Sequence, residues 1–369
     1  MHIPFVNLSI QYQALKSQID AAIQAVINDT AFVRGKYVAA FEDAFARAYG
    51  VKHCIGCANG TDAIYIVLKM LGIGPGDEVI TTACSWISTS EAITQTGARP
   101  VFVDIDPDYY AINPELIERM ITEKTKAILP VHLYGQPAEM DKIVDLCNRH
   151  KLLLIEDCAQ AHFAEYRGGK VGTFGIAGTF SFYPGKNLGA YGDAGCIITN
   201  DDEFARKARM YANHGSLKKH EHEIEGVNSR LDGLQAAILS VKLPHIHEWN
   251  RCRYEHAMRY NELLAEVPGI EPPKIRPDAA HIFHVYCIRA KQRDALIAHL
   301  KTHGVETAIH YPTALPFLKA YASFGHKPED FPVAWQYQQQ ILSLPMFPEL
   351  QEEQIQRIVH AIKSSGLSQ

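Results

Sequence analysis

Between about residues 51 and 200, the chain alternates short β-branched runs with longer stretches of helical spacing. Four of the β-branched runs are Glu78–Thr81, Pro100–Asp104, Ala127–Val131 and Leu152–Asp157. Such alternation is typical of a mainly parallel sheet wrapped by helices, so it predicts an α/β fold. In sheets of this kind a ligand lies beyond the carboxyl ends of the strands, which is where Asp104, His132 and Asp157 fall.

The flanking segments predict further helices and a second, smaller part of the molecule. Apolar residues at helical spacing predict a helix from Tyr12 to Asp29 with one buried face. Further on, helices are expected over residues 201–213, 231–241, 250–265, 293–303 and 351–362, and a strand over 284–288. We therefore expect an N-terminal helix plus a large α/β domain over residues 1–245, and a small α+β domain over residues 246–369.

The composition argues against several functional classes. The formal charge is −5 and no long run of Lys or Arg occurs, so the electrostatic footprint of a nucleic-acid binder is missing. The eight cysteines lack framework spacing, which suits reduced thiols. Neither Cys54–Cys57 nor the histidine-rich segment 218–223 predicts a metal site. Because there is no apolar run of about 18 residues and no secretory leader, we expect a cytoplasmic protein.

Lys186 and Asp157 carry the strongest chemical signal in the chain. Lys186 lies in the glycine-rich segment Ser181–Asp193, and Asp157 ends an apolar run 29 residues earlier. An amine that condenses with a carbonyl, together with a carboxylate that holds a pyridine nitrogen protonated, is the minimum equipment for pyridoxal 5'-phosphate (PLP) chemistry. Simpler interpretations stay open, since a lysine in such a loop is usually a solvated charge and Asp157 could be a ribose-binding or structural carboxylate.

Nearby segments fit a flat, phosphorylated cofactor. Asn59–Ala63 precedes a helical run and would form a phosphate cradle, although an ordinary helix cap is the commoner role of such residues. Trp86 follows a strand, where an indole either stacks on a cofactor ring or packs in the core. Gln160 and His162 follow Asp157 closely enough for one of them to contact the same ligand, and a packing role is equally open for His162.

Five ordered motifs give a more specific indication. They are Asn59–Ala63, Glu156–His162, Ser181–Gly189, Asn228–Asp232 and His310–Pro312. Together they closely resemble the DegT/DnrJ/EryC1/StrS family of PLP-dependent nucleotide-sugar aminotransferases, and the resemblance runs from Pro4 to about Ile362. It implies the aspartate aminotransferase fold (fold type I), with a mainly parallel, seven-stranded type of sheet in the large domain.

The resemblance also implies roles for individual residues. Lys186 would form a Schiff base with PLP and later move a proton between substrate and cofactor, while Asp157 would pair with the pyridine nitrogen. The other implied cofactor contacts are Gly60, Thr61 and Ser181 to the phosphate, Gln160 to the ring hydroxyl, Trp86 to a ring face, and Asn228 to the phosphate from the neighbouring subunit. The substrate contacts we predict are His162, Tyr183, Arg230, His310 and Tyr311. A homodimer with shared active sites follows from the role of Asn228.

The chain departs from the family pattern at a few positions. Residues 192–195 read Gly-Asp-Ala-Gly where Gly-Asp-Gly-Gly is common, and Phe163 follows His162 where the family usually has glycine. We interpret both departures as packing variations. Pro316 stands where many relatives have a histidine, so a sugar contact by that histidine is not carried over.

The function implied by the resemblance is transfer of an amino group from L-glutamate to a nucleotide-linked keto-sugar. The product would be an amino sugar for a surface polysaccharide, such as a lipopolysaccharide O-antigen, or a related glycan. The opening Ile3–Leu8, with Gln11 and Tyr12, resembles members that act at C3 of a dTDP- or UDP-linked sugar, and action at C4 is the alternative. A sugar dehydratase of the same fold would have histidine in place of Lys186.

Two alternatives lie outside this chemistry. One is a non-catalytic regulatory or sensory protein, which early names in the family suggested, but no helix-turn-helix is apparent and the chain is acidic. The other is a nicotinamide-dependent dehydrogenase, which requires a G-x-G-x-x-G segment between a strand and a helix. No such segment occurs in the sequence.

Overall fold

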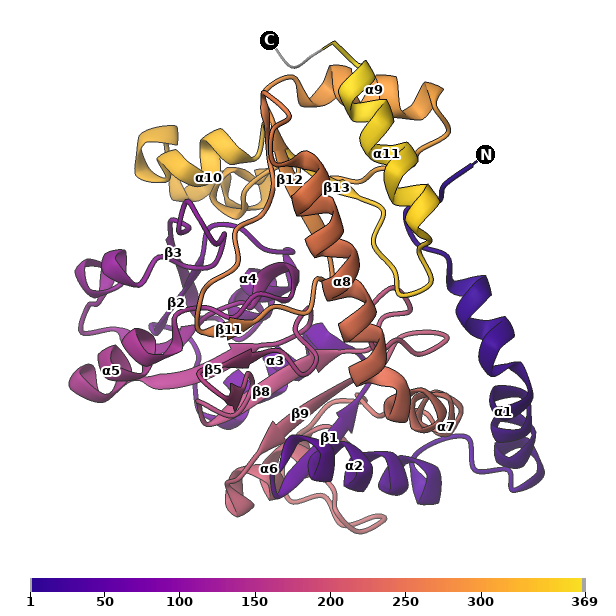
Figure 1. The fold of residues 1–369 in the computed structure, drawn as a ribbon. Helices are drawn as coiled ribbons and strands as arrows, with labels where there is room; N and C mark the ends of the chain where they lie inside the picture. Colours follow the sequence, from indigo (N-terminus) through magenta and orange to yellow (C-terminus); the bar gives the residue numbers. More distant parts are fainter. Residues whose placement is uncertain (1, 367–369) are drawn as a thin grey trace.

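A seven-stranded, mainly parallel sheet forms the centre of the larger part of the molecule (Figure 1). The structure is a computed structural model that describes residues 2–366. The strand order is β1-β9-β8-β5-β4-β2-β3, and β9 runs antiparallel to its neighbours β8 and β1. The strands are β1 (His53–Cys57), β2 (Glu78–Thr82), β3 (Arg99–Val103), β4 (Thr125–Leu129), β5 (Leu153–Asp157), β8 (Ala177–Ser181) and β9 (Gly195–Thr199). The predicted α/β fold is confirmed.

Helices pack on both faces of this sheet, because alternate residues of a strand point to opposite faces. In β9, Cys196 and Ile198 join the core under α2 and α7, whereas Ile197 joins the core under α3 and α6. The helices of this part are α1 (Leu8–Asn28), α2 (Gly35–Tyr49), α3 (Gly60–Met70), α4 (Ser88–Gln95), α5 (Met140–His150), α6 (Asp202–Tyr211), α7 (Gly233–Lys242) and α8 (Ile246–Leu264). Both faces of the sheet are therefore buried.

The sequence analysis did not predict helix α2. Its buried residues Val38, Phe41, Phe45 and Tyr49 recur at spacings of three and four, which places them on one face of the helix. Gly50 ends the helix with a φ of 75°, a left-handed conformation that glycine adopts at little cost. The periodic signal was therefore present in the sequence.

Phe163, where the family usually has glycine, adopts a φ of 64°. This left-handed conformation is unfavourable for a bulky residue, so surrounding contacts must stabilise it. The backbone N–H of Phe163 donates to the Tyr49 hydroxyl at 2.7 Å, and the two ring centroids are 4.4 Å apart. These contacts agree with the interpretation of the departure as a packing variation.

The C-terminal part contains a three-stranded antiparallel sheet covered by helices. Its strands are β10 (Ile270–Glu271), β12 (Tyr286–Ala290) and β13 (Ile341–Leu344), and its helices are α9 (Arg293–Thr302), α10 (Pro332–Tyr337) and α11 (Glu352–Ser364). A separate small sheet joins β6 (Glu165–Tyr166), β7 (Gly169–Lys170) and β11 (Ala279–Ala280). Short 3₁₀ helices span Pro114–Leu116, Glu118–Met120, Leu133–Gly135, Leu243–His245, Leu315–Phe317, Lys319–Phe324 and Pro328–Asp330.

The two parts of the chain are tied together by α1 and α8. Ile3, just before α1, bonds through its N–H to the Gly304 carbonyl at 2.8 Å and is buried in the core of the C-terminal part. Helix α8 follows α7 almost directly and runs from the large sheet to α11 (Figure 1). The division at residues 245 and 246 stays a prediction, and residues 1 and 367–369 of the predicted domains lie outside the described residues.

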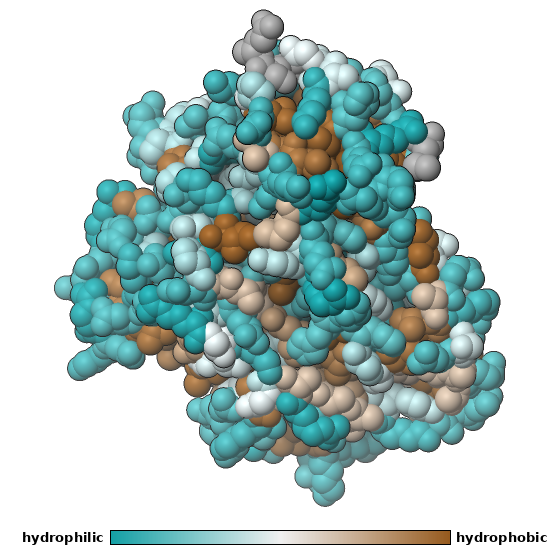
Figure 2. Space-filling model, in the orientation of Figure 1, coloured by the Kyte–Doolittle hydropathy of each residue, from teal (hydrophilic) through white to brown (hydrophobic). Residues whose placement is uncertain are grey.

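The surface in Figure 2 is mainly hydrophilic, with small apolar patches between the polar side chains. Within residues 2–366, no helix has the length and apolar character needed to cross a bilayer. All eight cysteines are free, and all except Cys252 are buried.

Candidate active site

A cavity of about 590 Å³ opens at the carboxyl ends of the parallel strands, where the fold predicts a ligand. Asp157 and Ser181 end β5 and β8 at its floor, and Trp86 and Val131 follow β2 and β4. The structure brings together most of the residues predicted from the sequence. Those that line the cavity are Gly60, Thr61, Trp86, Asp157, Gln160, Ser181, Tyr183, Lys186, His310 and Tyr311.

The N-terminus of α3 forms one end of the cavity. The Asn59 side chain caps the helix by accepting the Asp62 N–H at 2.8 Å, so the N–H groups of Gly60 and Thr61 are left without partners within the helix. A Cβ atom on Gly60 would lie 2.7 Å from the Ser181 Cβ, so glycine allows β8 to approach. Free N–H groups and a hydroxyl at a helix start suit a phosphate.

Asp157 presents a buried carboxylate to the cavity without a cationic partner. Its Oδ1 accepts the Ala159 N–H at 3.1 Å and its Oδ2 accepts the Thr89 hydroxyl at 2.8 Å. Among the described residues, no Lys, Arg or His forms an ion pair with it. Burial raises the pKa of the Asp157 carboxyl, while these two hydrogen bonds and the more distant charge of Lys186 oppose the shift. A carboxylate in this state fits the protonated nitrogen of a pyridine ring.

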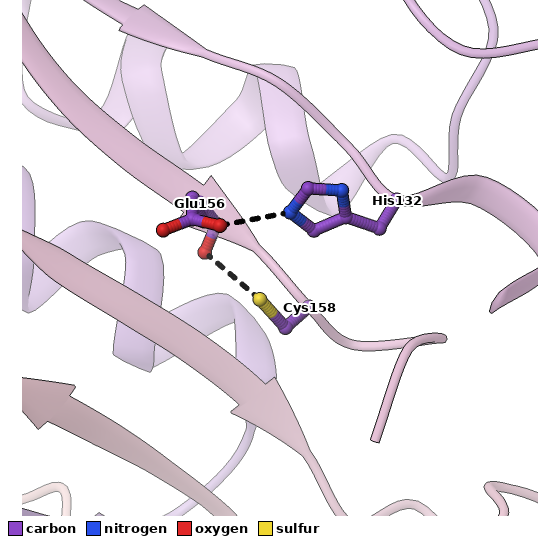
Figure 3. Close-up of side chains that lie close together, drawn as sticks. All are labelled: His132, Glu156 and Cys158. Atoms are coloured by element: carbon purple, nitrogen blue, oxygen red, sulfur yellow. Dashed lines mark hydrogen bonds and ion pairs between the residues drawn. The ribbon is translucent and has the colours of Figure 1, made fainter. Parts of the chain in front are cut away.

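Glu156, the preceding residue, points to the opposite side of β5 and forms a separate buried cluster (Figure 3). Its carboxylate accepts the N–H groups of Gly172 at 2.7 Å, Phe174 at 2.7 Å and Gly175 at 3.0 Å. His132 Nδ1 accepts a backbone N–H, so its Nε2 carries the proton and donates to Glu156 at 3.1 Å. Although Cys158 lies close by, these bonds already occupy the carboxylate and the imidazole, so the cluster is structural rather than a metal site.

Gln160 is held in one orientation beside Asp157. Its Oε1 accepts the Tyr134 N–H at 2.7 Å, and its Nε2 donates to the Tyr311 hydroxyl at 2.9 Å. Because a backbone N–H can only donate, the amide cannot flip, and the second Nε2 hydrogen remains available to a ligand oxygen. This arrangement fits the predicted contact with a ring hydroxyl.

The loop that carries Lys186 is compact and is held by a contact from helix α7. The Lys186 N–H donates to the Tyr183 carbonyl at 2.8 Å, and a Cβ atom on Gly189 would lie 2.3 Å from the Pro184 carbonyl oxygen. The buried Lys242 of α7 donates to the Gly189 carbonyl at 2.7 Å. Among the described residues, none accepts a hydrogen bond from the Lys186 amine, so the amine is free to react with a ligand.

Aromatic side chains line the mouth of the cavity. Trp86 and Tyr183 are 57% and 59% exposed, so a ligand can reach both rings. The Trp86 ring centroid is 5.4 Å from that of Tyr311. His310 Nδ1 bonds the Ser343 hydroxyl at 2.8 Å, and burial lowers its pKa to about 4. The stacking of Trp86 and the substrate contacts of the other three residues stay predictions.

Three predicted residues lie outside the cavity. His162 is fully buried between Phe180 and Phe182, and burial lowers its pKa to about 3. Neither ring nitrogen has a hydrogen-bond partner in the part of the chain that the structure describes. The position of His162 agrees with a packing role. Because the ring is fully buried, it does not contact a ligand in the cavity directly. Asn228 is exposed, and Arg230 lines a separate small hollow. The role of Asn228 depends on a second copy of the chain and stays a prediction.

The sequence analysis missed Thr89, His284 and Phe5, which also line the cavity. Thr89 lies three residues after Trp86, on the first turn of α4, so its position next to the predicted indole was a usable signal. His284 precedes β12 and reaches the cavity only through the packing of the two parts. No local pattern identifies it.

Comparison with known proteins agrees with this geometry. The model of the DegT/DnrJ/EryC1/StrS aminotransferase family matches residues 13–363. The chain is 50% identical to a pleiotropic regulatory protein of Geobacillus stearothermophilus, with 98% of each chain covered. It is 42% identical to dTDP-3-amino-3,4,6-trideoxy-alpha-D-glucose transaminase of Streptomyces venezuelae, covering 98% of this chain and 95% of the relative. It is 44% identical to UDP-N-acetyl-3-dehydro-alpha-D-glucosamine 3-aminotransferase of Acidithiobacillus ferrooxidans, covering 98% and 97%.

A solved structure confirms the fold. The crystal structure of S. venezuelae DesV in complex with a ketimine intermediate superimposes with a TM-score of 0.96 at 41% identity, and 98% of each chain is covered. The predicted family, the enzyme class and the cofactor are thereby confirmed. The chain belongs to the DegT/DnrJ/EryC1/StrS aminotransferase family, and its cofactor is pyridoxal 5'-phosphate.

Proposed function

We propose that this aminotransferase moves an amino group from L-glutamate to C3 of a dTDP- or UDP-linked keto-sugar, making an amino sugar for a surface glycan. The observation that carries the proposal is that the Lys186 amine and the Asp157 carboxylate line one cavity, and that neither forms an ion pair with a described residue. The names of the S. venezuelae and A. ferrooxidans relatives support a nucleotide-linked sugar aminated at C3. We also place the reaction in the cytoplasm.

Lys186 is suited to transferring a proton near neutral pH. Burial lowers its pKa to about 8, against the opposing effect of Asp157, so a useful fraction of the amine is unprotonated at neutral pH. When bound, PLP supplies the electron sink that makes a carbon next to nitrogen acidic. The Lys186 Nζ, which lies in the same cavity, would be the group that accepts the proton from that carbon and gives it back.

Asp157 and the α3 terminus orient the cofactor for this step. The Asp157 carboxylate favours a protonated pyridine nitrogen, and Thr89 and Ala159 keep that carboxylate aimed into the cavity. The N–H groups of Gly60 and Thr61 would hold the phosphate. Together these residues would fix the position of the cofactor relative to Lys186, and proton transfer requires that alignment.

We further propose that the active sites are shared between two copies of the chain. Phe32 and Val33 are adjacent in sequence and 45% and 50% exposed, so together they form a small apolar edge. They lie beside the segment that carries Asn228, since the Phe32 carbonyl accepts the Gly233 N–H and Val33 bridges Asp232. A second copy that covers this apolar edge would place its own Asn228 near the cavity, as the resemblance implies.

The regulatory alternative is supported by the names of two relatives, the pleiotropic regulatory protein of G. stearothermophilus and a sensory transduction protein of Saccharopolyspora erythraea. Membership of an aminotransferase family and the complete Lys186–Asp157 arrangement favour catalysis. A regulatory role in addition to catalysis is compatible with the structure, whereas a purely non-catalytic role leaves this arrangement unexplained.

Lys186→Ala should abolish transamination while leaving the fold and the binding of pyridoxamine phosphate intact. Losing the amine removes both the covalent link and the base, so the rate should fall by roughly 10²–10⁴-fold or more. The measurement is the change in visible absorbance after L-glutamate is added to the PLP-loaded protein. Lys301→Ala on the exposed face of α9 is the control, and normal turnover by the Lys186→Ala variant would contradict the assignment.

The substrate proposal predicts which sugar restores the PLP absorbance once glutamate has removed it. A panel of dTDP- and UDP-linked 3-keto and 4-keto sugars is added one at a time in single turnovers. We expect one 3-keto sugar to react about 100-fold faster than its 4-keto isomer, because misplaced hydroxyls leave polar groups in the pocket unpaired. A faster reaction with a 4-keto sugar would establish the C4 alternative.

The shared-site proposal predicts complementation between two inactive variants. Lys186→Ala lacks the amine, and Asn228→Asp places a negative charge against the phosphate. Random mixing makes half of the dimers mixed, and one of the two sites in each mixed dimer is intact, so about a quarter of full activity should return. If Asn228 acts within its own subunit, mixing the two proteins restores nothing.

The depressed pKa of Lys186 predicts a pH-dependent stability difference in the cofactor-free protein. The folded value of about 8 lies below the ordinary 10.5, so both states are protonated below pH 8 and burial of the charge costs stability there. As pH rises from 8 to 10.5, only the folded amine has lost its proton, and the cost disappears. Lys186→Met should therefore be more stable than the wild type at pH 7.

The expected difference at pH 7 is on the order of 2 kcal/mol, less than the full pKa shift implies because the side chain keeps some exposure. Denaturant unfolding at pH 7 and pH 10.5 measures it, with Lys301→Met as the control. A difference that is the same at both pH values would show that Lys186 packing, rather than its charge, determines the effect.

A further inference from the structure

Asn187, directly after Lys186, belongs to a buried hydrogen-bond chain that crosses between the two parts of the molecule. Its Nδ2 donates to Asn250 Oδ1 at 2.8 Å and to the Ile282 carbonyl at 3.2 Å. Asn250, on α8, donates through its own Nδ2 to the His162 carbonyl at 2.9 Å. The chain ends at His284, whose Nδ1 lies 3.1 Å from Asn187 Oδ1.

Backbone carbonyls fix the direction of every bond in this chain. The His162 carbonyl can only accept, so the Asn250 amide nitrogen faces it and the Asn250 oxygen faces Asn187. Asn187 must then donate to Asn250, which leaves its oxygen facing His284. The proton of the His284 ring therefore lies on Nδ1, and Nε2 carries a lone pair.

The surroundings keep the His284 ring neutral. Burial lowers its pKa well below the ordinary value, and the positive charges of Lys186 and Arg253 lower it further. The other titratable groups that face it are His162 and His310, and the pKa of each is lowered in the same way. The unprotonated Nε2 is thus a permanent hydrogen-bond acceptor.

Lys186 and His284 line the same cavity, and each has a polar atom without a hydrogen-bond partner among the described residues. These atoms are the nitrogen of the Lys186 amine and Nε2 of His284. Among the charged groups, Lys186 has the largest effect on the pKa of His284. Among the described residues, Lys186 and His284 are not hydrogen-bonded to each other. Rotation about the four side-chain bonds of Lys186 would bring its amine to the His284 ring.

We propose that His284 is a positioning residue for Lys186, accepting a hydrogen bond through Nε2 from the lysine amine whenever that amine is free in the cavity. Asn187 and Asn250 maintain the ring tautomer that makes this bond possible. The inference rests on the proposed role of Lys186 as the reacting amine. In this proposal, His284 holds the Lys186 amine near the substrate. Because Asn187 is bonded to Asn250 of α8, the position of His284 depends on how the two parts of the molecule pack.

Two substitutions of His284 separate the role of Nε2 as a hydrogen-bond acceptor from the bond between Nδ1 and Asn187. In His284→Asn, the amide nitrogen replaces Nδ1, so the bond to Asn187 is kept and the acceptor is lost. In His284→Gln, the amide oxygen replaces Nε2, so an acceptor is kept and the bond to Asn187 is lost. His220→Asn, on an exposed loop, is the control.

The first readout is the pKa of Lys186 in the full-length protein freed of cofactor, measured by mass spectrometry as the pH dependence of acylation at that residue. An acceptor favours the charged amine, so His284→Asn should lower this pKa by about one unit, while His284→Gln should stay close to the wild type. The inference is overturned if His284→Asn leaves the Lys186 titration unchanged.

The second readout is kinetic and separates positioning from general damage. His284→Asn should lower kcat about tenfold with little change in KM for either substrate, and His284→Gln should recover most of that loss. Equal losses in both variants would mean that the ring is structural and would overturn the inference. Retained transamination by the Lys186→Ala variant would contradict the proposed function. The effect of His284 on the pKa of Lys186 is measured in the cofactor-free protein and is tested independently of that result.

The tautomer can be read directly. Nitrogen-15 NMR of the histidine-labelled protein, with the His284 signals assigned by their loss in His284→Gln, should show a proton on Nδ1 and no titration between pH 6 and 8. A proton on Nε2 would contradict the proposal, since the acceptor would then not exist.

Discussion

The end of strand β5 carries two consecutive carboxylates, and the site depends on how they are separated. Because successive side chains of a strand point to opposite faces, Glu156 faces the core and Asp157 faces the cavity. Three backbone N–H groups and His132 satisfy the Glu156 charge, which fixes the edge where β4, β5 and the loop of residues 172–175 meet. The Asp157 carboxylate accepts two hydrogen bonds and forms no ion pair with any of residues 2–366. The first carboxylate holds the framework, and the second is left ready for a positively charged ring.

Lys186 reaches the same cavity from β8, on a loop that is anchored twice. Lys242 of α7 holds the Gly189 carbonyl, and the Asn187 side chain is bonded to Asn250 of α8. Helix α8 also packs against α11 in the C-terminal part, so the placement of the lysine depends on how the two parts pack. This coupling explains why residues as far apart in sequence as Phe5 and His310 line one cavity with Lys186. The position of the loop that carries Lys186 thus depends on contacts with distant parts of the chain.

The sequence predicted the parts of this account that depend on local pattern. Asp157, Ser181 and Trp86 were predictable because parallel strands deliver their carboxyl ends to one edge, and Gly60 and Thr61 because a helix begins there. Helix α2 was missed although its apolar spacing was visible, and strand β13 is too short to give a clear pattern. His162 has a motif position that suggests a ligand contact, but the ring is enclosed by Phe180 and Phe182. His284 was missed because only tertiary packing brings it to Lys186, and no spacing in the sequence records that.

The central claim is that Lys186 is the residue that binds the cofactor covalently. The most direct measurement is to load the protein with PLP, reduce it with borohydride and map the modified peptide by mass spectrometry. The account predicts one stable pyridoxyl group per chain, attached to Lys186 within the segment Ser181–Gly189. A modification on another lysine, such as Lys242, or none at all, would contradict it.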